Sequence, residues 1–180
     1  MKTNPWAFLS LACGLQTQAI ERTCTRRSWP TFRKEGQDHP LLSRFPGSVI
    51  YAYQQNVFDE YGLILGKVVG MEVEKVKELE GKVTKIVYDV PEGRSTLEVY
   101  RNYEAALTGA GFTMLWQAKG AEELGSWGDL RKFFGGMHYN HTNQRYLAAH
   151  LKRPEEGDVY MAFYLNLDLS MRRSISVVKA

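Results

Sequence analysis

The sequence lacks most of the features that identify an enzyme or a membrane protein at sight. Its two cysteines, Cys13 and Cys24, lie near the N-terminus, where they provide neither a disulfide framework nor a convincing nucleophile. No Gly-x-Ser-x-Gly motif is present, and no apolar run is long enough to span a membrane. The composition that remains, 44% hydrophobic and 24% charged over 180 residues, is typical of a single globular domain.

The main body of the chain also lacks a net charge of either sign. Residues 1–36 carry six lysines and arginines against two glutamates, so the formal charge of +3 arises in this leader. The other 144 residues carry 17 basic and 18 acidic side chains. A near-neutral body offers no electrostatic footprint for a phosphate backbone, and we therefore expect no nucleic-acid partner.

A phosphate-binding loop is absent from the stretch that most invites that interpretation, EGRSTLEVYRNYEAALTGAG at residues 92–111. A phosphate loop needs its glycines before a helix, where backbone amides and the positive end of the dipole face the anion. Here Gly109 and Gly111 come after the expected helix. Ser95 followed by Glu98 indicates a capping box at its start.

The same stretch predicts a structural helix over residues 95–108. Apolar side chains recur three or four positions apart, which is typical of a helix with one buried face. The members of this stripe are Leu97, Tyr100, Tyr103 (or Glu104) and Leu107.

The N-terminus resembles a secretory signal. Lys2 provides a thin positive region, Trp6–Leu15 a short apolar region and Thr17-Gln-Ala19 a small-residue cleavage site. The alternative is an irregular cytosolic N-terminus, which Pro5 and the arginines after the cleavage site favour. We expect a signal peptide at 1–19, an extended lead-in at 20–47, a single domain at 48–170 and a tail at 171–180.

Strand patterns in the remaining sequence predict an α+β fold. Residues 48–54 form a short β-rich run, and residues 72–90 are typical of a hairpin that turns at Glu80-Gly81, although 72–79 also fits a helix. The segments 82–90, 95–108 and 112–117 then form a β-α-β unit. We expect an antiparallel sheet with the 95–108 helix packed on one face.

A C-terminal hairpin completes the predicted sheet. Tyr146–Arg153 and Val159–Ser170 flank the polar turn PEEGD. The second strand alternates without a fault, which predicts one face on the core and one wetter face. Tyr146, Tyr160 and Tyr164 share the wetter face as a candidate ligand platform for bases or sugars, or else pack under a helix.

Two histidines three residues apart, His138 and His141, are the best metal candidates in the sequence. A zinc site needs a third or fourth ligand at suitable spacing, and none is evident. Exposed loop histidines are the alternative interpretation. We assign no catalytic residue, no cofactor and no firm metal ligand.

Four stretches resemble a bacterial family of exported domains of unknown function. They are DHPLLSRFPGSVI (38–50), FDEY (58–61), the block 79–116 and RYLAAHLKRPEEGDVYMAFYL (145–165). Members of that family often precede an OmpA-type C-terminal domain, and the resemblance covers about residues 37–167. It implies a periplasmic or outer-membrane context and provides no established catalytic residue.

These observations favour a non-enzymatic envelope module that binds a protein, glycan or lipid partner. A second hypothesis is a metal-dependent hydrolase built around His138 and His141. A third is a fragment of a longer OmpA-type protein. Neither a transmembrane helix nor an oligomeric state is predicted.

Overall fold

The computed structural model describes residues 36–70, 72–126, 130, 143–166 and 172–179, the last range by its backbone. Within these residues the elements follow in chain order: β1 (Val49–Ile64), β2 (Val68–Val69), β3 (Glu72–Val73), β4 (Val76–Asp89), α1 (Thr96–Gly109), β5 (Thr113–Lys119), α2 (Gly120–Leu124), β6 (Arg145–Leu151), β7 (Val159–Leu165) and β8 (Arg172–Lys179). Among them, no helix has the length and apolar composition that a membrane crossing requires.

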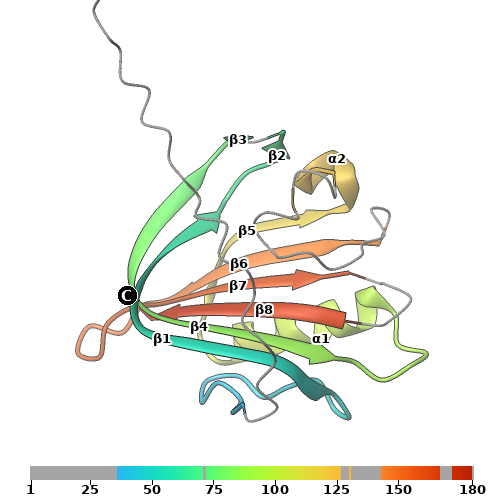
Figure 1. Cartoon of the computed structure of the whole chain (residues 1–180), viewed down its shortest axis with the longest axis horizontal. Helices are drawn as coiled ribbons and strands as arrows, with labels where there is room; N and C mark the ends of the chain where they lie inside the picture. The colour runs from blue at the N-terminus through green and yellow to red at the C-terminus, as the bar shows by residue number, and fades with distance from the viewer. Residues whose placement is uncertain (1–35, 71, 127–129, 131–142, 167–171, 180) are drawn as a thin grey trace, which may run out of the picture.

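Six strands form one antiparallel sheet in the order β1-β4-β8-β7-β6-β5 (Figure 1). The broad α+β prediction is therefore confirmed. The predicted β-α-β unit has all three of its elements, but β4 and β5 are not neighbours, because β8, β7 and β6 lie between them. The connection through α1 thus crosses most of the sheet.

The predicted hairpin turn at Glu80-Gly81 is wrong. The chain does not reverse at this point, and β4 continues from Val76 to Asp89. Gly81 has a φ of 152° and pairs with Asp59 beside a bulge in β1, where Val57 and Phe58 together oppose Lys82. The glycine marks a bend in two long paired strands, which Figure 1 shows curling over toward α2.

The short first strand predicted at 48–54 is likewise only the beginning of β1, which runs for 16 residues. It pairs with β4 along almost its whole length, from Val49↔Asp89 to Ile64↔Val76. Beyond this pairing, the short ribbon β2–β3 forms the tip of the hairpin.

Residues 172–179, which we expected in a tail outside the domain, form a strand inside the sheet. β8 pairs with β4 on one side and with β7 on the other. This placement joins the first hairpin to the terminal meander β5–β6–β7. The sheet is continuous because of it.

Helix α1 begins and ends much as its sequence predicts. The Ser95 hydroxyl accepts a hydrogen bond from the backbone N–H of Glu98 at 3.1 Å, so the N-cap is confirmed. At the other end, Phe112 N–H donates to Leu107 C=O and Gly111 N–H to Thr108 C=O, each at 3.0 Å. These two bonds are those of a Schellman motif.

The buried face of α1 differs from the predicted stripe by one residue. Leu97 is 46% exposed, whereas Val99 is fully buried. Tyr100, Tyr103 and Leu107 are buried as expected. Val99 packs in the main core of the protein, whereas Leu97 lies on the exposed side of the helix.

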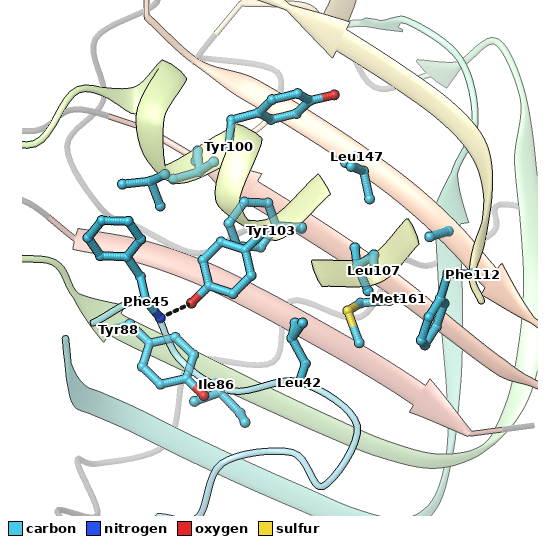
Figure 2. Packing of buried hydrophobic residues seen from close by; sticks show 14 of the residues in the cluster. Leu42, Phe45, Ile86, Tyr88, Tyr100, Tyr103, Leu107, Phe112, Leu147 and Met161 are labelled. Atoms are coloured by element: carbon cyan, nitrogen blue, oxygen red, sulfur yellow. Dashed lines mark hydrogen bonds between the residues drawn. The ribbon is translucent and has the colours of Figure 1, made fainter. Parts of the chain in front are cut away.

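The main core lies between α1, the sheet and the lead-in segment 36–48. Leu42 and Phe45 of the lead-in are buried against the helix and the strand residues Ile86 and Met161 (Figure 2). The Phe45 N–H donates a hydrogen bond to the Tyr103 hydroxyl at 2.9 Å, drawn as a dashed line in Figure 2. Complete burial of each large apolar side chain contributes roughly 1.5–3 kcal/mol.

A second core fills the opposite face of the sheet. Its members come from the curled end of β1–β4, from β6 and β7, and from the region of α2: Leu63, Ile64, Val68, Leu79, Val83, Ala118, Leu124, Leu130, Tyr146, Ala148, Tyr160, Ala162 and Tyr164. Every residue of β7 is consequently buried. The prediction of one wetter face on this strand is wrong, because the tip of the β1–β4 hairpin covers it.

We predict that Tyr103→Phe lowers the free energy of unfolding by about 1–3 kcal/mol, because the buried Phe45 N–H loses its acceptor. Chemical denaturation measures the change. Tyr100→Phe is the matched control, since no hydrogen bond joins the Tyr100 hydroxyl to another described residue. Equal destabilisation by both variants would contradict the role of the Phe45–Tyr103 bond.

Candidate functional site

The candidate site is a cleft between the tip of the β1–β4 hairpin and the strand at the other edge of the sheet. Its volume is about 540 Å³, within the size range of small-ligand sites. The lining residues are Leu65, Gly66, Lys67, Glu74 and Lys75 from the tip, Trp116 and Gln117 from β5, and Glu123 from α2. Figure 1 shows the tip, β5 and α2 at the same end of the molecule.

Close packing beside the cleft fixes the distance between its walls. A Cβ atom at Gly125 would lie 2.2 Å from the Val68 carbonyl oxygen, and the φ of Gly125 is 121°. Only glycine satisfies both conditions. Val68 and Leu124 are buried in the same core, so the tip and the end of α2 are held together there.

Trp116 connects the cleft to the second core. Its ring is half-buried and lies 5.4 Å from the ring of Tyr146, tilted by 51°. Such a contact is a favourable aromatic geometry and keeps the indole in place. The part of the indole that lines the cleft is therefore a rigid apolar surface for a ligand.

The acidic side chains of the cleft are bound by the protein itself. Glu74 accepts a hydrogen bond from the Lys67 N–H at 3.2 Å, and Glu123 accepts one from the Lys119 N–H at 2.8 Å. By contrast, the ammonium groups of Lys67 and Lys75 form no ion pair with another described residue. Both carboxylates keep their charge, since a backbone N–H is neutral; the lysines are the charged side chains of this lining that form no hydrogen bond or ion pair within the described residues.

The three tyrosines of the predicted ligand platform do lie on one face, but they are not exposed. Tyr146 pairs with Tyr164 across β6 and β7, and their exposed fractions are 0% and 2%, with 8% for Tyr160. Burial raises the pKa of the Tyr146 and Tyr164 hydroxyls, which therefore stay protonated. Ligand binding by these rings stays a prediction; the packing alternative accounts for their position.

The predicted metal candidates His138 and His141 lie outside the described residues. Within the described ranges, no group of three histidine, cysteine or acidic side chains is placed to hold a metal ion. His39 lies in the lead-in, where its Nδ1 accepts a hydrogen bond from the Leu41 N–H at 3.3 Å. Burial, together with Lys82 and Arg153 nearby, lowers the pKa of His39.

A histidine–carboxylate pair that the sequence did not predict lies at the β6–β7 turn. His150 Nε2 is 2.9 Å from Asp158 Oδ2, and its ring stacks on Tyr160 at 4.4 Å. Asp158 also accepts a hydrogen bond from the Arg153 N–H at 3.2 Å. Nucleophilic catalysis would need a hydroxyl or thiol bonded to the imidazole, and no such group from the described chain contacts it. The pair fixes the turn.

A second polar cluster, also not predicted, attaches the lead-in to the sheet. Asp38 accepts hydrogen bonds from the Arg44 Nε at 2.8 Å and from the Tyr88 hydroxyl at 2.8 Å. Burial and the bond to Asp38 raise the pKa of Tyr88, and burial raises that of Tyr103 to about 12. Hydroxyls that remain neutral serve as hydrogen-bond partners here rather than as reactive groups.

No protein-family model and no curated protein sequence matches this chain. The assignment of a function therefore depends on the geometry of the described residues and on the resemblance noted in the sequence.

Sequence reasoning missed the cleft residues for an identifiable reason. The run LGKVVGMEVEK at 65–75 contains two glycines and a change of strand pattern, which mark the true tip of the hairpin. The strand pattern predicts the turn at Glu80-Gly81 instead, and a turn there does not bring Lys67 and Lys75 to the same tip. Trp116 gives no signal, because the tip residues that line the cleft with it are more than 40 positions away in the sequence.

We predict that His150→Phe raises the pKa of Asp158 toward its ordinary value of 3.8, because the bond to His150 is the largest cause of its lowering. In the wild type, the bond between His150 and the Asp158 carboxylate stabilises the folded protein above about pH 3.8. This stabilisation is lost as the pH falls through the lowered pKa of Asp158. NMR titration of the Asp158 carboxyl carbon measures this pKa in the wild type and in the variant.

Lys152→Ala is the matched control for this titration, since the charge of Lys152 is the smallest of the named causes. A pKa of Asp158 that is the same with and without the imidazole would refute the coupling. So would a larger shift in the Lys152 variant.

Proposed function

We propose that this protein is a non-enzymatic binding module of the bacterial cell envelope, which holds a protein, glycan or lipid partner in the cleft between the β1–β4 tip and β5. The observation that carries the proposal is the cleft itself. A rigid aromatic surface, Trp116, lies beside two lysines whose charges the described chain leaves unpaired. Binding sites typically combine an apolar surface with a few placed polar groups in this way.

The arrangement favours binding over chemistry. The acidic groups of the cleft, Glu74 and Glu123, each accept a hydrogen bond from a backbone amide, which fits a structural role. The His150–Asp158 pair belongs to another part of the sheet. It orients a turn and contacts no cleft residue in the described structure.

The envelope location is supported by two features of the sequence. The leader has the charge, apolar length and small-residue site of a secretory signal. The stretches at 38–50, 79–116 and 145–165 resemble exported domains found ahead of OmpA-type domains. A periplasmic or outer-membrane-associated module is the proposal that both features support.

Export predicts a processed N-terminus. After expression of the full chain in a Gram-negative host, cell fractionation and intact-mass spectrometry should show a chain that begins at Ile20 in the periplasmic or membrane fraction. Ala19→Arg, which removes the small residue before the cleavage site, should block processing. An unprocessed wild-type chain that remains in the cytosol would exclude the envelope proposal.

Binding in the cleft predicts local responses to a ligand. We expect soluble peptidoglycan disaccharide-peptides, extended octapeptides or phospholipid vesicles to shift the NMR resonances of the Trp116 indole and of the Lys67 and Lys75 amides. Trp116→Ala should then weaken binding tenfold or more, as for a buried aromatic anchor. Leu97→Ala is the control, because Leu97 is exposed on α1 and should change affinity less than twofold.

The absence of any cleft response to all three classes of ligand would count against the proposed function. Equal losses in the Trp116 and Leu97 variants would also do so, since they would place binding outside the cleft.

A further inference from the structure

One wall of the cleft is the free edge of a β-sheet. Within the described residues β5 is the last strand in the sheet order, and β6 is its one partner strand there. The Gly120 N–H donates to the Gln144 carbonyl at 2.9 Å, so residue 120 faces β6. The Lys119 N–H donates instead to the Glu123 carboxylate, so residue 119 faces away.

The alternation of an antiparallel ladder then fixes which other groups of β5 face the cleft. Hydrogen-bonded and non-hydrogen-bonded pairs alternate along two antiparallel strands. Since Lys119 is outward, Gln117 is outward too, and Gln117 lines the cleft. Its backbone N–H and C=O therefore point away from β6, on the edge of the sheet that borders the cleft, in the geometry that a further strand requires.

Glu123 sets the limit of this free edge. By accepting the Lys119 N–H at 2.8 Å, its carboxylate occupies the last outward donor of β5. An added strand would thus pair with the edge before Lys119. Leu115, 39% exposed at the bulge of β5, is the nearest exposed apolar side chain on this edge.

The opposite wall selects the charge of the ligand. Lys67 and Lys75 line the cleft and have no acidic partner among the described residues, whereas Glu74 and Glu123 are held by backbone amides. An extended segment with acidic side chains complements this wall. A basic segment would meet these two ammonium groups, and its partners would be carboxylates that already accept a backbone amide.

We propose that the cleft binds an extended acidic peptide segment, which adds a strand to the free edge of β5 at Gln117 while its carboxylates contact Lys67 and Lys75. The inference rests on the proposed function and names the class of partner. In strand addition, main-chain hydrogen bonds provide affinity and side-chain contacts provide specificity. Trp116 provides the apolar surface beside the added strand.

The test uses the full chain and an octapeptide of alternating glutamate and valine with blocked ends. Gln117→Pro removes the outward N–H, and proline is tolerated in an edge strand where the N–H faces solvent. Gln117→Ala is the matched control, because it keeps that donor and loses the same side-chain bond to Glu104. We expect the proline variant to bind the peptide at least tenfold more weakly and the alanine variant within about twofold of wild type.

Two further measurements do not depend on how the proline variant folds. A glutamate peptide N-methylated at alternate residues should bind the wild-type protein at least tenfold more weakly, because the methyl groups block its ladder bonds. The double variant Lys67→Glu/Lys75→Glu should lose the acidic peptide and favour one with lysine in place of glutamate. Lys82→Glu, an exposed change at the bend of β4, should leave both affinities unchanged.

Equal affinity for the N-methylated and unmodified peptides would overturn the inference, as would equal affinity of the wild-type protein for acidic and basic peptides. A peptidoglycan fragment or a vesicle that shifts the cleft resonances when the acidic peptide does not would overturn the inference and leave the proposed function intact. If none of the probes shifts the resonances of the cleft residues, both the inference and the proposed function are overturned.

Discussion

The structure depends on the closure of one long hairpin over the sheet from which it starts. β1 and β4 bend where Val57 and Phe58 oppose Lys82, and their tip then meets the end of α2. Val68 and Leu124 pack in the same core, and the close approach of the Val68 carbonyl to Gly125 leaves no room for a side chain at position 125. This closure covers the second face of the sheet with side chains of the hairpin.

Closure explains why the central strands are apolar on both faces. Once the tip covers β6 and β7, polar groups on the inner face must find partners within the protein. Gln144 meets this requirement by donating to the Gly125 carbonyl at 2.7 Å and accepting from the Tyr164 hydroxyl at 3.1 Å. Asn166 donates to the same hydroxyl at 3.2 Å. The end of the closed region is therefore held by hydrogen bonds as well as by packing.

Local rules predicted the elements whose causes are local. The capped helix α1 follows from Ser95 and its neighbours, and the hairpin β6–β7 follows from a strict alternation around a polar turn. Long-range pairing decided the rest: β4 continues through Gly81 because β1 lies beside it, and residues 172–179 join the sheet because β4 and β7 leave a place between them. The cleft was beyond sequence reasoning, since Trp116 faces a tip that only this pairing brings near.

In the part of the chain that the structure describes, the same closure leaves β5 without a second partner strand. The tip reaches α2 and Gly125, but it approaches β5 only across the cleft, so the outward groups of that edge are not used in pairing. Proteins commonly protect such edges with charge or with a covering segment. Here Glu123 protects the end at Lys119, and the lysines of the tip lie across the cleft from the remainder. Under the proposed strand addition, the two lysines, which bond to no described residue, favour a partner with acidic side chains, so one arrangement both limits unspecific pairing and selects a partner.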